Sequence, residues 1–200
     1  ALNRSEFRQN RLFAQVWAAA AWQSLGLSVS PLSPDQAIAV MAFTMGLHEK
    51  FNEAVLEYWH NFQYKTLHFL LTQAVGTLRD TQGWQCLDVS LEVCGVRYEA
   101  QLGATVRFGR FVPMSLSKKT SPCEEKATEL EVRTCHGGEI WKVTSNTYNK
   151  EVLIPPFETF EVIGVTWEGE KTRIQLRSTG AYSSYNCEWL RGDSTGHSLG

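Results

Sequence analysis

Residues 148–163, YNKEVLIPPFETFEVI, contain the pattern that decides the fold of this chain. An apolar Val-Leu-Ile run leads into two prolines, and aromatic and acidic residues then alternate. This alternation has the period of a β-strand, and prolines between such runs indicate a break between two strands. Glu151, at the head of the first run, is either a working carboxylate at the lip of a cleft or simply the first residue of a strand.

The same two-residue period extends upstream to Gly83 and downstream toward residue 190. In CLDVSLEV (86–93), Leu87, Val89, Leu91 and Val93 alternate with polar residues, which is typical of a half-buried strand. Further strands are expected at ATVRFGRF (104–111), ELEVRTC (129–135), EVLI (151–154), FETFEVIGV (157–165), TRIQLR (172–177) and AYSSYNCEWL (181–190).

Before Gly83 the pattern is helical. SPDQ (33–36) is a helix start, because Ser33 can cap, Pro34 suits the first helical position and Gln36 stands where a capping-box partner belongs. That helix should end near Gly46. A clear apolar stripe follows over residues 64–78. We expect His68, inside this stripe, to be a core histidine with its polar atoms satisfied and not a ligand.

Helices followed by strands indicate an α+β protein. We expect one domain over residues 1–200, with a helical part (1–82), a strand-rich part (83–190) and a flexible tail (191–200). A net charge of -2 argues against a nucleic-acid partner, which would require an excess of Lys and Arg. The sequence contains no P-loop, GxSxG or HExxH motif, and its five histidines show no metal-ligand spacing.

The five cysteines show no CxxC pair, which weakens a zinc interpretation and favours disulfides. Asn3-Arg4-Ser5 is a glycosylation sequon, so Asn3 is a candidate glycosylation site. Together these features favour an oxidising, extracellular environment. The odd cysteine count leaves one thiol that is free, pairs with another chain or lacks its partner here.

EVLIPPFETFEVI closely resembles the signature of the vertebrate ecto-ADP-ribosyltransferases, the arginine-specific mono-ADP-ribosylating enzymes of cell surfaces. Further segments look like family segments in family order. They are AFTMGLHEKFNEAV (42–55), FQYKTLHFLLTQAV (62–75), GATVRFGRF (103–111), RTCHG (133–137) and LRSTGAYSSYNCEWL (176–190). The resemblance implies the ADP-ribosyltransferase fold, in which a helical half packs on a mixed, mostly antiparallel, β-sandwich-like half.

The resemblance also implies NAD as cofactor and an Arg, a Ser and a Glu-x-Glu in three segments. A carboxylate held at the ribose stabilises the oxocarbenium-like transition state, and the arginine serves the dinucleotide phosphates. On matching positions, Leu91 stands in place of the arginine, Pro113 in place of the first serine and Asn149 in place of the upstream glutamate. Glu151 is retained, and Ser115 matches the second serine.

These replacements favour a catalytically silent member of the family that binds an unidentified protein partner, with no cofactor. Its location is expected to be extracellular, either secreted or held at the membrane by a lipid (GPI) anchor. The alternative is an active enzyme that transfers ADP-ribose from NAD to arginine, with Glu151 as its key carboxylate.

The resemblance implies one disulfide, between Cys86 and Cys135. Cys94 and Cys123 match no family cysteine and could pair with each other. Cys187 matches a family cysteine whose partner would lie upstream of residue 1, so it is unpaired or bonded elsewhere.

Overall fold

The computed structural model describes residues 4–25, 30–51, 64–117, 123, 126–144 and 150–182. The helices come first, as the sequence predicts: α1 (Arg4–Gln9), α2 (Arg11–Ser24), α3 (Pro34–Ala42), a π-helical turn η1 (Phe43–Leu47) and α5 (Lys65–Thr81). Among the described residues, none of the helices combines the length and apolar character that a membrane crossing requires.

The start of α3 forms as its sequence indicates. The Ser33 side chain accepts a hydrogen bond from the backbone of Gln36, the Gln36 side chain accepts one from the backbone of Ser33, and Pro34 opens the helix. This capping box satisfies backbone N–H groups that an open helix end would leave unpaired. The helical path breaks in η1, where Gly46 adopts a positive φ of 112°, and this confirms the predicted end near Gly46.

The apolar stripe of α5 also forms as predicted. The buried residues of this helix are Leu67, Leu70, Leu71, Ala74, Val75 and Leu78. His68 packs against the rings of both Phe51 and Phe111, at centroid distances of 6.3 and 5.4 Å. Burial lowers the pKa of His68 below its ordinary value, because a charged imidazole is poorly solvated among apolar rings.

In the described residues of the strand-rich part, eight strands form one sheet in the order β2-β7-β8-β4-β1-β3-β6-β5. The strands are β1 (Leu87–Cys94), β2 (Thr105–Val106), β3 (Val112–Ser115), β4 (Ala127–Thr134), β5 (Gly138–Glu139), β6 (Glu151–Ile154), β7 (Glu158–Glu168) and β8 (Lys171–Ala181), with a 3₁₀ turn η3 (Ile140–Val143) after β5. Among the described strands, only β4 and β8 run parallel, and the other paired strands are antiparallel.

The predicted strand over residues 104–111 is wrong in extent. Only Thr105 and Val106 pair with a neighbour, and β3 begins separately at Val112. Residues 107–111 do not continue the ladder, so the alternation in this segment did not mark a continuous strand. β5 was not predicted, because two paired residues are too short for a periodic signal. Of the predicted strand 181–190, only residues 181 and 182 are described.

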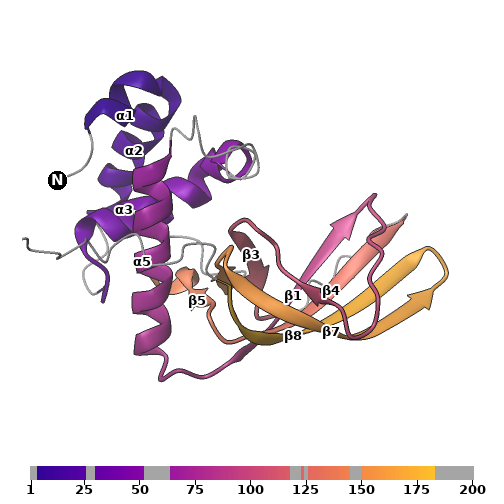
Figure 1. Ribbon diagram of the computed structural model, residues 1–200. Coiled ribbons are helices and arrows are strands. Elements are labelled where there is room, and N and C mark those ends of the chain that lie inside the picture. The colour runs from indigo at the N-terminus through magenta and orange to yellow at the C-terminus, as the bar shows by residue number, and fades with distance from the viewer. Residues whose placement is uncertain are drawn as a thin grey trace, which may run out of the picture.

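Two apolar cores stabilise the molecule. The first unites the helices with Phe111, Ile140, Val143 and Leu153 from the sheet part. The second collects side chains from β1, β3, β4, β6, β7 and β8 on one face of the sheet. Figure 1 shows α5 beside β5, with β1, β4, β7 and β8 extending away from the helices. The structure thus joins a helical part to a curled, mixed sheet, as expected for an α+β protein.

Candidate functional site

A pocket of about 300 Å³ lies where the helical part meets β3 and β6. Its floor is apolar, since Met41 and Phe43 are almost completely buried. Its polar groups come from separate segments. The lining residues are Met41, Phe43, Thr44, Met45, His48, Pro113, Thr144 and Glu151. The structure therefore brings together two of the four positions that the sequence singled out, Pro113 and Glu151.

Glu151 is the first residue of β6 and is half-buried. Its neighbour Lys150 has a positive φ of 40°, a backbone conformation that costs a non-glycine residue about 1 kcal/mol or more. The Lys150 ammonium lies 5.9 Å from the ring centroid of Trp141. Within the described part of the chain, the Glu151 carboxylate has no recorded hydrogen bond or ion pair. Glu151 is thus both a strand-entry residue and the carboxylate of a pocket.

Cross-strand pairing places two serines beside Glu151. Ser115 of β3 stands directly opposite Glu151, and Ser90 of β1 stands opposite Ser115. Directly opposed residues of neighbouring strands point to the same side of a sheet. Ser90, Ser115 and Glu151 therefore form one row on one face. Sequence reasoning singled out Ser115 but missed Ser90.

Leu91 belongs to the opposite face of β1, because successive residues of a strand alternate between faces. Its side chain is partly buried against the second core, which also contains Val89. This confirms the predicted inward face shared by Leu91 and Val89. Leu91 does not line the pocket that holds Pro113 and Glu151. The structure consequently separates Leu91 from the retained carboxylate.

Pro113 pairs with Leu153 of β6 and lines the pocket on the face of Ser115. Proline contributes neither a hydroxyl nor a backbone N–H. β1 pairs with β3 only at Ser90 and Ser115, so one side of β3 is unpaired before Ser115. Proline is tolerated at such a strand edge.

Both disulfides that the sequence suggested are present. Cys86 is bonded to Cys135, and Cys94 is bonded to Cys123. The first joins the start of β1 to the end of β4; the second ties the end of β1 to the segment before β4. Three expected features lie outside the described residues, namely Asn149, the Asn3 sequon and Cys187. Residues 191–200 lie outside them as well.

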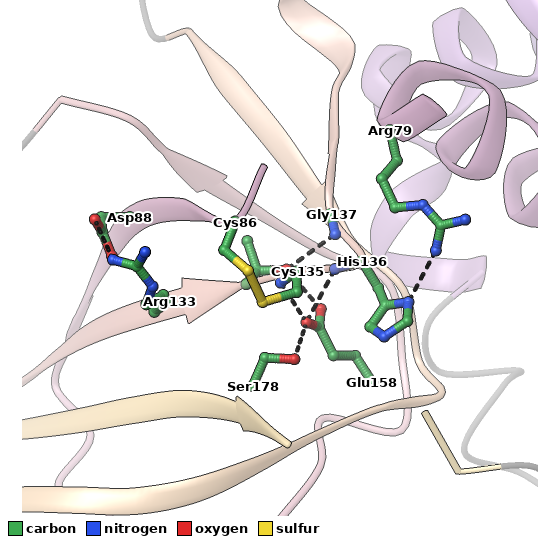
Figure 2. Close-up of a disulfide and its surroundings, with 10 residues drawn as sticks. Arg79, Cys86, Asp88, Arg133, Cys135, His136, Gly137, Glu158 and Ser178 are labelled. Carbon is green, nitrogen blue, oxygen red and sulfur yellow. Dashed lines mark hydrogen bonds and ion pairs between the residues drawn. A yellow bond between two sulfur atoms is a disulfide. The ribbon is translucent and has the colours of Figure 1, made fainter. Parts of the chain in front are cut away.

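Sequence reasoning also missed Glu158, which is fully buried at 0% exposure. Its carboxylate accepts hydrogen bonds from the Thr134 hydroxyl at 2.6 Å, the Cys135 and His136 amides at 2.7 and 3.1 Å, and the Ser178 hydroxyl at 2.7 Å. Figure 2 shows this cluster around the Cys86–Cys135 disulfide.

The signal for a buried Glu158 was present in the alternation of β7. Glu158 lies two and four residues before Phe160 and Val162, so it shares their face of the strand, and both of those residues are buried. It therefore had to face the core, and a buried carboxylate requires donors. The acidic residue that stabilises the strand-rich part is thus distinct from the one in the pocket.

Comparison with known proteins agrees with this architecture. The profile of the family "NAD:arginine ADP-ribosyltransferase" matches residues 1–184. The erythroblast NAD(P)(+)–arginine ADP-ribosyltransferase of Gallus gallus is 43% identical, over 95% of this chain and 68% of the relative. The GPI-linked NAD(P)(+)–arginine ADP-ribosyltransferase 1 of Mus musculus is 38% identical, over 95% of this chain and 66% of the relative.

The chain thus spans about two thirds of the length of these curated relatives. Among solved structures, the crystal structure of the eucaryotic mono-ADP-ribosyltransferase ART2.2 superposes with a TM-score of 0.78 at 27% identity, covering 93% of this chain and 86% of that one. The α+β fold of helices and a mixed, mostly antiparallel sheet is therefore the ADP-ribosyltransferase fold. The chain belongs to the NAD:arginine ADP-ribosyltransferase family.

Proposed function

We propose that this chain is a family member without NAD-dependent transfer and that it acts by binding a protein partner outside the cell. The observation that carries the proposal is the composition of the pocket at Glu151. Among the described residues that line it, no arginine or lysine is present. Within this described lining, the pyrophosphate of NAD would therefore meet a carboxylate without a lysine or arginine beside it, and charged oxygens removed from water require a compensating cation.

The replaced positions support the same conclusion. Pro113 lines the pocket where the family resemblance implies a serine. Leu91, where it implies an arginine, contacts the second core on the opposite face of β1. Restoring function would therefore require more than one change, because residues that serve one transition state act together.

The same pocket has features that fit a partner's side chain. Met41 and Phe43 provide an apolar floor, and Glu151 provides one negative charge at its edge. A lysine or arginine side chain matches this combination, since its stem is apolar and its head is cationic. We therefore propose a basic side chain of a partner protein as the group that enters the pocket.

The extracellular location is supported by the two disulfides. Disulfides persist in oxidising compartments and are rare in the cytosol. The mouse relative carries "GPI-linked" in its name. Secretion or lipid anchoring is the corresponding proposal for this chain.

The second candidate is an active arginine ADP-ribosyltransferase. It is favoured by the row in which Ser115 stands opposite Glu151 on the face that lines the pocket, since a serine beside a carboxylate can help to hold it in position. In this case NAD would be the cofactor and Glu151 the catalytic residue.

Thermal unfolding with and without NAD separates the two candidates. A ligand that binds only the folded state at 100 times its Kd stabilises by about 2.7 kcal/mol. For a chain of this size that raises the melting temperature by about 5–11 °C. We expect no shift at millimolar NAD. A shift of several degrees would refute the absence of NAD binding, and nicotinamide release by the parent that Glu151→Gln abolishes would establish the enzyme instead.

Partner binding is measured separately, with the labelled domain on intact cells. Glu151→Lys should reduce cell binding, because it reverses the only acidic charge among the described pocket residues. Gln23→Lys makes a charge change of the same sign on the exposed surface of α2 and should leave binding unchanged. Equal binding by both variants and the parent would refute a role for this pocket.

A further inference from the structure

A second cavity lies on the face of the sheet over β1, β4 and β8. This groove has a volume of about 420 Å³, within the range of about 300–1,000 Å³ typical of small-molecule sites. It shares no described lining residue with the pocket at Glu151. Its polar side chains stand in neighbouring strands, because Gln175 of β8 pairs with Glu131 of β4 and Glu131 pairs with Ser90 of β1.

An exposed amide–carboxylate pair from β8 and β4 lines the groove. The Gln175 amide donates a hydrogen bond to Glu131 at 2.8 Å. Gly164 of β7 stands opposite Gln175 of β8. A Cβ atom at Gly164 would lie 2.5 Å from the Gln175 amide oxygen. The position of Gln175 therefore depends on the absence of a side chain at Gly164.

The walls are apolar, and one of them is produced by an irregularity of β7. The pairing of β7 with β8 shifts register between Val162 and Gly164, and the extra residue, Ile163, is 44% exposed. Such bulges re-aim side chains and are common beside binding sites. Ile163 and Leu116 both line the groove.

The mouth of the groove carries charges of both signs. Arg133 lies 3.2 Å from Asp88, and both side chains are largely exposed. The lining includes two carboxylates, Asp88 and Glu131, against one guanidinium, Arg133. This balance disfavours an anionic ligand, which would face more negative than positive charge. It also disfavours a purely apolar ligand, which would desolvate these groups without replacing their hydrogen bonds.

We propose that this groove binds a neutral saccharide unit. A sugar ring presents hydroxyl groups that both donate and accept, and the carboxylate, amide, guanidinium and hydroxyl of Glu131, Gln175, Arg133 and Ser90 offer complementary partners. Its C–H faces match the apolar walls. The proposal goes beyond the proposed function, because it concerns a separate cavity and a different class of ligand.

The test uses methyl glycosides of glucose, galactose, mannose and N-acetylglucosamine as probes, with saturation-transfer NMR and calorimetry. At least one glycoside should bind with a Kd on the order of 1 mM, or about -4 kcal/mol. Gly164→Ala should weaken it about tenfold, because the new methyl group displaces the Gln175 amide. Its fold should persist, since Gly164 has no left-handed φ.

Thr166→Ala is the matched control, because Thr166 is exposed on the same strand and does not line the groove. Gln175→Leu provides a second disruption that leaves β7 unchanged. A neutral glycan on a partner glycoprotein is distinguished from a free sugar by loss of glycoprotein binding after enzymatic deglycosylation.

Three results would overturn the proposal. They are no binding by any probe at roughly ten times the expected Kd, binding that Gly164→Ala and Gln175→Leu leave intact, and binding restricted to sulfated or sialylated sugars. Glu151→Gln should not change saccharide binding. The outcome is therefore independent of whether the pocket at Glu151 binds a partner.

Discussion

Replacing Glu158 by alanine should destabilise the protein strongly. The substitution removes an acceptor that four donors share, and it leaves the backbone N–H groups of Cys135 and His136 without this partner. An unsatisfied buried donor costs about 1–3 kcal/mol. The loss is offset in part because a buried carboxylate is itself poorly solvated.

The balance of these effects gives a destabilisation of about 3–5 kcal/mol, which is the usual cost of breaking a buried charged network. In a domain of this size it corresponds to a fall in melting temperature of about 6–20 °C. Glu158→Gln should cost less, about 1–2 kcal/mol, because its amide oxygen still accepts hydrogen bonds. The NH₂ group of this glutamine, however, would face the Thr134 hydroxyl, which already accepts a hydrogen bond from the Gly137 amide.

The assay is urea unfolding under non-reducing conditions, followed by circular dichroism and tryptophan fluorescence. The matched control is Glu161→Ala on the same strand, which breaks a solvent-exposed ion pair with Arg177 and should cost no more than about 1 kcal/mol. If Glu158→Ala and Glu161→Ala lost equally little stability, the role assigned to the buried network would be wrong.

Three further outcomes are expected. NAD at millimolar concentration should leave the melting temperature unchanged, and calorimetry giving micromolar affinity would contradict this. The combined variant Leu91→Arg, Pro113→Ser, Asn149→Glu should release nicotinamide faster than the parent, whereas each single change should do little. Adding Glu151→Gln to the combined variant should abolish this gain. Robust nicotinamide release by the parent that Glu151→Gln abolishes would refute the proposal that the protein is catalytically silent. Because burial lowers the folded-state pKa of His68 below 6.5, the unfolded chain binds more protons there, so the free energy of unfolding should fall as the pH drops below about 6.5. His68→Phe should flatten this part of the pH profile, and an unchanged profile would contradict the assignment.

Signals from neighbouring residues predicted much of the fold. The capping residues before α3, the stripe of α5 and the alternation of β1 each depend on residues close in the chain, and each formed as expected. The order of helices and strands was sufficient for the α+β class. The family resemblance added the Cys86–Cys135 disulfide.

Which side chains meet was decided by tertiary structure. Alternation shows that Ser90 and Leu91 point to opposite faces, but only the register of β1, β3 and β6 brings Ser90 and Ser115 into one row with Glu151. Register joins residues far apart in the chain, so local sequence carries little information about it.

The hydrogen-bond network of Glu158 and the groove both depend on contacts between strands that are distant in the chain. The parity of Glu158 indicated that it faces inward, yet its donors come from β4, the turn after it and β8. The groove requires a register shift in β7 beside a glycine that leaves space for Gln175. The sequence by itself determined the elements and their buried faces, because those depend on local period. The sites depend on contacts between distant strands, which form only when the sheet assembles.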